Sequence, residues 1–81
     1  MARKILYNEY GAPCTSPISK SATAYDYCNS RGDKAVILHR GGKYEVHSAF
    51  YKCKGFNSLN TARKELINHS PIGCSDWEEV A

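Results

Sequence analysis

Seven side chains in this sequence are suited to catalysis or metal binding: His39, His47, His69, Cys14, Cys28, Cys53 and Cys74. A catalytic cysteine needs a base within reach, and a zinc site usually draws on closely spaced ligand pairs. The cysteine spacings are long and irregular, and there is no C-x-x-C pair. We therefore expect mostly free thiols and isolated histidines, with no catalytic residue, metal or cofactor. A disulfide or a metal role for the cysteines is the alternative.

Residues 34–51 are the segment that would position two of these histidines. Two runs rich in β-branched and aromatic residues flank Gly41-Gly42, which predicts a β-hairpin with a two-residue turn. In the resulting register His39 lies opposite Tyr44 and Ile37 lies opposite Val46. One face, the expected core face, then carries Ala35, Ile37, Tyr44, Val46 and Phe50. The other carries Val36, Leu38, Arg40, Lys43, Glu45 and His47, so His39 and His47 point to opposite sides.

Residues 3–10 are predicted to form a first strand, and residues 17–29 a first helix. Ser16 would be the N-cap of that helix and Pro17 its first residue. A helical stripe supports this interpretation: Ile18, Ala22, Tyr25 and Cys28.

The second half of the chain is predicted to hold one more helix, over residues 59–68, with Asn57 or Ser58 as its N-cap. Residues 52–56 form a connector or an extension of the third strand. Ile72 and Trp77 are expected to pack back, while residues 75–81 form a frayed acidic tail. The predicted fold is one α+β domain over residues 1–81, in the order β-α-β-β-α. Its three-stranded antiparallel or mixed sheet has both helices on one face.

The net charge of +3 is unevenly distributed along the chain. Residues 31–64 contain eight basic side chains and three acidic ones, whereas the last seven residues contain three acidic side chains and no basic one. A basic surface with aromatic side chains suits a polyanionic partner. The candidate partner-binding residues are Arg40, Lys43, Tyr44, Tyr51, Lys52, Lys54, Arg63 and Lys64.

No apolar run approaches the length of a membrane span, and the N-terminus lacks the pattern of a signal peptide. We expect a cytoplasmic protein that does not contact a membrane.

In size and compact α+β layout the chain resembles the small phage-encoded proteins that inhibit host defences, such as anti-CRISPR proteins. The resemblance implies a non-catalytic inhibitor that binds a host protein or a protein–nucleic-acid complex. Because no catalytic constellation is visible, protein–protein contact is the first functional hypothesis. A small nucleic-acid-binding domain that uses the basic face is the second, and an enzyme or metal protein built on Cys and His is the third.

Overall fold

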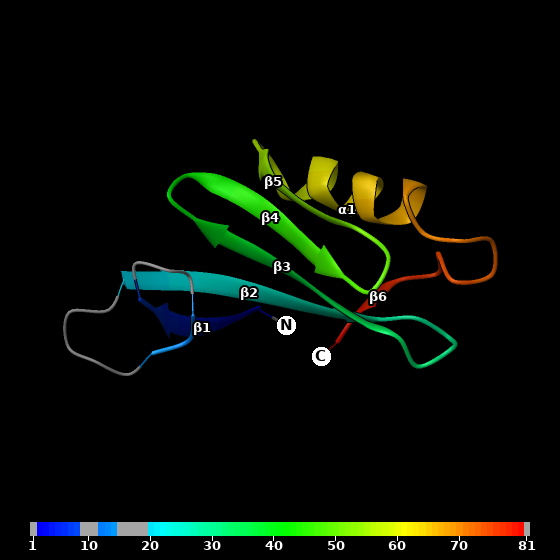
Figure 1. Ribbon diagram of the computed structural model, residues 1–81, viewed down its shortest axis with the longest axis horizontal. Helices are drawn as coiled ribbons and strands as arrows, with labels where there is room; N and C mark the ends of the chain where they lie inside the picture. The colour runs from blue at the N-terminus through cyan, green and yellow to red at the C-terminus, as the bar shows by residue number, and fades with distance from the viewer. Residues whose placement is uncertain (1, 9–11, 15–19, 81) are drawn as a thin grey trace.

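A computed structural model describes residues 2–8, 12–14 and 20–80 of the chain. Within these residues it contains β1 (Ala2–Tyr7), β2 (Lys20–Cys28), β3 (Lys34–Arg40), β4 (Lys43–Ser48), β5 (Lys52–Phe56), α1 (Leu59–Asn68) and β6 (Glu78–Glu79). The strands form one antiparallel sheet in the order β1-β2-β3-β4-β5 (Figure 1). The molecule is elongated, with extents of 42 × 23 × 19 Å.

The short strand β6 extends the β1 edge of the sheet. Both β1 and β6 pair with β2: Ala2 lies opposite Tyr25, and Glu79 lies opposite Tyr27. The Val80 N–H also donates a hydrogen bond to the Asp26 carbonyl at 2.8 Å. The last residues described are therefore held against β2, where we expected a frayed tail.

The predicted three-stranded sheet with two helices is wrong, since the described residues form six strands and one helix. Residues 20–28, expected to be helical, form β2, while residues 16–19 lie outside the described part. The segment has a helical period, but it also alternates, with Tyr25 and Tyr27 on one face and Ala22 and Ala24 on the other. Pairing with both β1 and β3 satisfies the backbone of β2 on both sides and buries Tyr27.

The hairpin and the second predicted helix are confirmed. The register of β3 and β4 is the expected one, and Gly41 and Gly42 have φ angles of 60° and 74° in the turn. The helix α1 begins after Ser58, whose Oγ accepts a hydrogen bond from the Thr61 N–H. Both elements carry their own local signals, a two-glycine turn and an N-cap.

Two strand boundaries differ from expectation. The first strand ends at Tyr7, and residues 9–11 lie outside the described part. The connector at residues 52–56 is a separate strand, β5, because the chain reverses at Ser48. Ser48 donates its N–H to the Tyr51 carbonyl, and its Oγ accepts from the N–H groups of Phe50 and Tyr51. These bonds replace the ladder at the turn, so the chain returns alongside β4.

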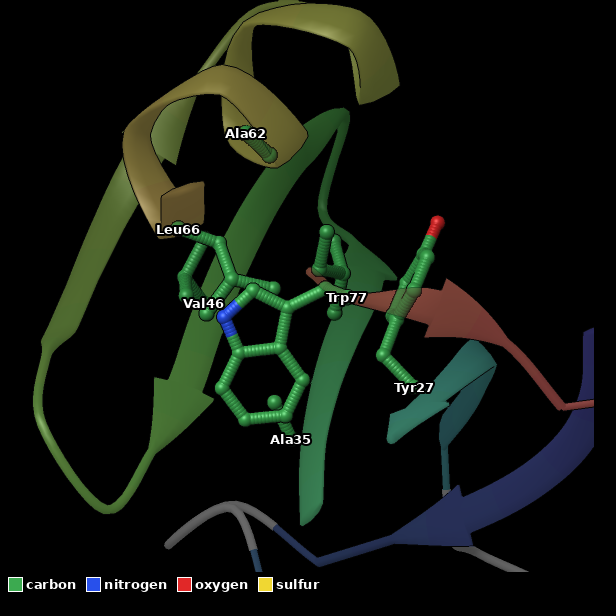
Figure 2. Packing of buried hydrophobic residues seen from close by; sticks show 7 residues of the cluster. Tyr27, Ala35, Val46, Ala62, Leu66 and Trp77 are labelled. Atoms are coloured by element: carbon green, nitrogen blue, oxygen red, sulfur yellow. The ribbon is translucent and has the colours of Figure 1, made fainter. Parts of the chain in front are cut away.

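The core lies between α1 and one face of the sheet. Figure 2 shows the indole of Trp77 among Ala35, Val46 and Leu66. The indole N–H donates to Ser70 Oγ at 2.8 Å, so this buried ring has no unpaired polar atom. Trp77 thus joins the segment after α1 to the core.

Two apolar residues expected in or near the core are exposed. Ile72 is fully exposed, at 101%, in the loop after α1. Phe50 is 39% exposed, because it lies in the β4–β5 turn, where its ring meets Trp77 at a tilted angle with centroids 6.5 Å apart. The expectation for Phe50 was wrong because it extended the hairpin strand into the turn, and Ile72 does not pack back as expected.

Among the described elements, a helix covers one face of the sheet. The helix α1 packs mainly over β4 and less over β3 and β5 (Figure 1). Over residues 2–8, 12–14 and 20–80, no helix or strand packs on the opposite face. We call this the open face of the sheet.

Candidate binding surface

Strand alternation and the register assign the residues of the open face. They are Arg3, Ile5, Tyr7, Lys20, Ala22, Ala24, Asp26, Cys28, Lys34, Val36, Leu38, Arg40, Lys43, Glu45, His47, Lys52, Lys54 and Glu78.

Small side chains form the floor of the open face along β2. Ala24 is 0% exposed and Ala22 is buried, although no described helix or strand packs over them. The Arg40 guanidinium on β3 lies 4.7 Å from the centre of the Tyr7 ring on β1, a contact that spans β2. The centre of the face is therefore low and apolar, and its polar groups lie around that centre.

Glu45 carries a buried charge on the open face, with only 8% of the residue exposed. The Arg40 guanidinium donates two hydrogen bonds to its carboxylate, with Nε–Oε2 at 2.6 Å and Nη2–Oε1 at 3.0 Å. His47 Nε2 lies 3.2 Å from the same carboxylate. The hydrogen bonds from Arg40, and secondarily the contact with His47, hold the pKa of Glu45 below its usual value, against the opposing effect of burial. Bidentate pairing fixes Arg40 in place and uses part of its hydrogen-bonding capacity.

A second, more exposed ion pair lies near the β1 edge. Arg3 Nε donates to Asp26 Oδ2 at 2.7 Å, and Nη2 donates to Oδ1 at 3.2 Å. These bonds lower the pKa of Asp26. The pair is solvated, so it contributes little to stability, and its guanidinium stays within reach of solvent.

Exposed lysines lie at the β4–β5 side of the face. Lys52 lies opposite His47, and Lys54 lies opposite Glu45. Lys43, beside the hairpin turn, donates from Nζ to Asn57 Oδ1. All three lysines are exposed. They form a row of cations on the part of the open face that β4 and β5 contribute.

A β-bulge at Gly55 determines that Lys54 and Phe56 lie on opposite faces of the sheet. Glu45 pairs with Lys54 and Tyr44 pairs with Phe56, so Gly55 is an extra residue in β5. Without it, Lys54 and Phe56 would share a face. With it, Lys54 points to the open face while Phe56 packs against the core. Gly55 has a φ of 102°, a conformation that side-chain-bearing residues rarely adopt.

The structure divides the eight predicted partner-binding residues between two sides. Arg40, Lys43, Lys52 and Lys54 share the open face. The other four lie on the helix side: Tyr44, Tyr51, Arg63 and Lys64.

Three of the helix-side residues make ring contacts there. The Tyr44 ring stacks on His39 at 4.1 Å, and the Tyr51 ring stacks on His69 at 4.0 Å. The Arg63 guanidinium lies 5.8 Å from the centre of the Tyr27 ring. The two tyrosines therefore do not line the same surface as the four open-face cations.

Sequence reasoning missed three basic residues of the open face, Arg3, Lys20 and Lys34. Lys20 was missed because residues 20–28 were assigned to a helix. The alternation of Tyr25 and Tyr27 with Ala22 and Ala24 is the signal that would have placed it on a strand.

The positive charge of the described residues lies on the open face. This face carries seven basic and three acidic side chains, a net charge of +4. The other described basic residues are Lys4, Arg31, Arg63 and Lys64, and the other described acidic residues are Asp33, Glu65, Asp76 and Glu79. These four cations and four anions cancel. The modest charge of the chain is thus concentrated on one side of the molecule.

A cluster of titratable groups lies on the helix side. His69 Nε2 lies 3.1 Å from Glu65 Oε2, and the His69 ring stacks on Tyr51. A hydrogen bond with the Cys53 side chain is the main cause that raises the pKa of Tyr51 to about 12. The group lies at the surface, with Cys53 and His69 both exposed. A phenol with so high a pKa stays protonated near pH 7 and does not act as a base there.

The described thiols are dispersed over the fold. Cys28, Cys53 and Cys74 are free, on β2, on β5 and in the loop after α1. No group of three or more His, Cys, Asp or Glu side chains that could hold a metal ion is found within the described ranges.

Over the described residues, the fold is a small antiparallel sheet with one helix on one face. No family model, curated protein or solved structure shows a significant match to the chain. In the part of the chain that the structure describes, no helix has the length and hydropathy to cross a membrane.

Proposed function

We propose that this protein is a non-catalytic binding module that takes a nucleic acid on the open face of its sheet. The observation that carries the proposal is the division of charge: +4 on the open face and zero on the rest of the described residues. A polyanion is the partner that such a face attracts most strongly.

The arrangement of the cations supports a phosphate backbone as the partner. Five exposed lysines surround the low apolar centre of the face: Lys20, Lys34, Lys43, Lys52 and Lys54. Lysine ammonium groups act as mobile point charges that contact phosphates without a fixed geometry. Arg40, in contrast, is engaged by Glu45 and Tyr7 and holds the surface in shape. A cytoplasmic location is part of the proposal, because nucleic acids are abundant there.

A salt titration tests the proposal. The fluorescence anisotropy of a labelled oligonucleotide is measured with increasing protein at several salt concentrations. If five lysines each neutralise a phosphate, affinity falls roughly 100- to 1,000-fold between about 50 and about 200 mM salt. No binding at low salt, or binding that salt leaves unchanged, would contradict the proposal.

A second candidate is an inhibitor that binds a host protein complex, as the phage-type resemblance implies. The observation that favours it is the exposure of two apolar side chains in loops, Phe50 in the β4–β5 turn and Ile72 after α1. Apolar and aromatic side chains are typical anchors of protein interfaces.

The second candidate is tested by retention of a host protein on the immobilised chain after nuclease treatment. Replacement of Ile72 by Ser is expected to reduce this retention and to leave oligonucleotide binding unchanged. Retention that disappears with nuclease favours the nucleic-acid proposal instead.

A further inference from the structure

The open face offers few flat rings to a nucleic acid. Among the described Phe, Tyr and Trp residues, only Tyr7 lies on it; the smaller His47 imidazole also lies there, with Nε2 3.2 Å from the Glu45 carboxylate. The others lie in the core, on the helix side or in the β4–β5 turn: Tyr25, Tyr27, Tyr44, Phe50, Tyr51, Phe56 and Trp77. The Tyr7 ring is also covered on one side by the Arg40 guanidinium. The described face therefore offers a base only one tyrosine ring, covered on one side, and one imidazole held beside a carboxylate.

This distribution bears on the form of nucleic acid that fits. Proteins that bind single strands gain much of their affinity from bases stacked on exposed aromatic rings. A duplex hides its bases in the stack and presents its phosphates, at about one charge per 1.7 Å of helix axis. A surface with five exposed lysines and so few rings complements the second form better than the first.

The spacing of the lysines is consistent with contacts along the phosphate backbone of a nucleic acid. Lys52 and Lys54 are two residues apart on β5, about 7 Å along the strand. Lys43 continues the row at the hairpin turn, where Gly41 and Gly42 carry no side chains to hold a partner away. The two arginines of the face are paired with Asp26 and Glu45. Neither guanidinium is therefore available for the two parallel hydrogen bonds by which an arginine recognises a base edge.

We propose that the ligand of the open face is a double-stranded nucleic acid, held through its phosphates with little dependence on sequence. This inference deepens the proposed function and rests on it. The row Lys43, Lys52 and Lys54 contacts the backbone, and the ion pairs of Arg3 and Arg40 shape the surface.

The test compares four labelled probes of about 20 nucleotides per strand: a DNA duplex, an RNA duplex, and one single strand of each. We expect at least one duplex to bind roughly 10-fold more tightly than its own single strand. Two duplexes of unrelated sequence are expected to differ by less than about 3-fold. The DNA and RNA arms show which duplex is preferred.

A substitution of the ring on the face gives a second readout. Tyr7→Leu is expected to leave the ratio of duplex to single-strand affinity unchanged, because no base stacks on Tyr7. Circular dichroism confirms that the variant is folded. Single strands that bind as tightly as duplexes, or that lose more affinity than duplexes in Tyr7→Leu, would overturn this inference and leave the proposed function standing. Absence of binding to all four probes would overturn both.

Discussion

Glu45 is the residue on which the shape of the open face most depends. Its carboxylate is nearly buried and has polar partners on two strands, Arg40 on β3 and His47 on its own strand. A buried carboxylate is costly unless such partners compensate its lost hydration. The same contacts keep Arg40 over Tyr7, across the β2 alanines.

Replacement of Glu45 by Gln tests this network through the pH dependence of stability. The pKa of Glu45 is lowered in the folded protein, so its contribution is present above the unfolded pKa and is lost as pH falls through the folded pKa. Glu45→Gln is expected to be less stable than the parent at pH 7 by about 1–3 kcal/mol. The difference is expected to shrink as pH falls below about 4. Urea unfolding at pH 7, 5 and 3 measures it.

Glu65→Gln is the control for this measurement. Glu65 lies on α1 and contacts the exposed His69, so its replacement should change stability by less than about 0.5 kcal/mol. The pKa of Asp26 is also lowered, mainly by its hydrogen bond from Arg3. The stability of Glu45→Gln is therefore still expected to fall somewhat at low pH. A variant as stable as the parent at pH 7 would show that Glu45 does not organise the face.

At the scale of the element, β5 depends on its bulge. Gly55 allows Lys54 to face outward and Phe56 to face the core within three residues. A strict alternation cannot do this, because it would place both on one side. The composition of the open face and the packing of the core thus depend on one backbone conformation.

Replacement of Gly55 by Ala is expected to destabilise the protein by about 1–2 kcal/mol. An added Cβ meets no atom within 4 Å, so the cost comes from the φ of 102° alone. Gly41→Asn is the matched control, because Asn tolerates the φ of 60° in the hairpin turn. Urea unfolding of both variants measures the costs. An alanine variant as stable as the parent would mean that β5 does not need the bulge.

The elements differ in how well the sequence predicts them, and the reason is physical. The hairpin and α1 are predicted because Gly41-Gly42 and Ser58 specify their ends locally. β2 is mistaken for a helix because its pairing with β1 and β3 involves distant residues, which no local pattern reveals. β6 is missed for the same reason, since two glutamates have no strand signal of their own.

At the scale of the whole molecule, the two sides of the sheet differ in composition. Almost all described aromatic rings are on the helix side, and the net positive charge is on the open face. The sequence shows that the middle of the chain is rich in basic residues. It does not show that Lys54 and Arg63 lie on opposite sides of the sheet, because this depends on the strand pairing and on the bulge. Four of the eight predicted binding residues therefore share the open face, and four lie elsewhere.

The most direct test compares two triple variants that remove the same charge from opposite sides. One replaces Lys43, Lys52 and Lys54 by Gln, and the other replaces Lys4, Arg63 and Lys64 by Gln. Each takes the net charge of the chain from +3 to zero. Any difference between them therefore reports the location of the charge and not its amount.

Duplex binding is measured for both at several salt concentrations, after circular dichroism has shown that each is folded. The open-face variant is expected to lose at least about 30-fold in affinity at low salt and to show a salt slope shallower by about 3. The helix-side variant is expected to stay within about 3-fold of the parent. Equal losses in the two variants, or a larger loss in the helix-side variant, would contradict a binding site on the open face.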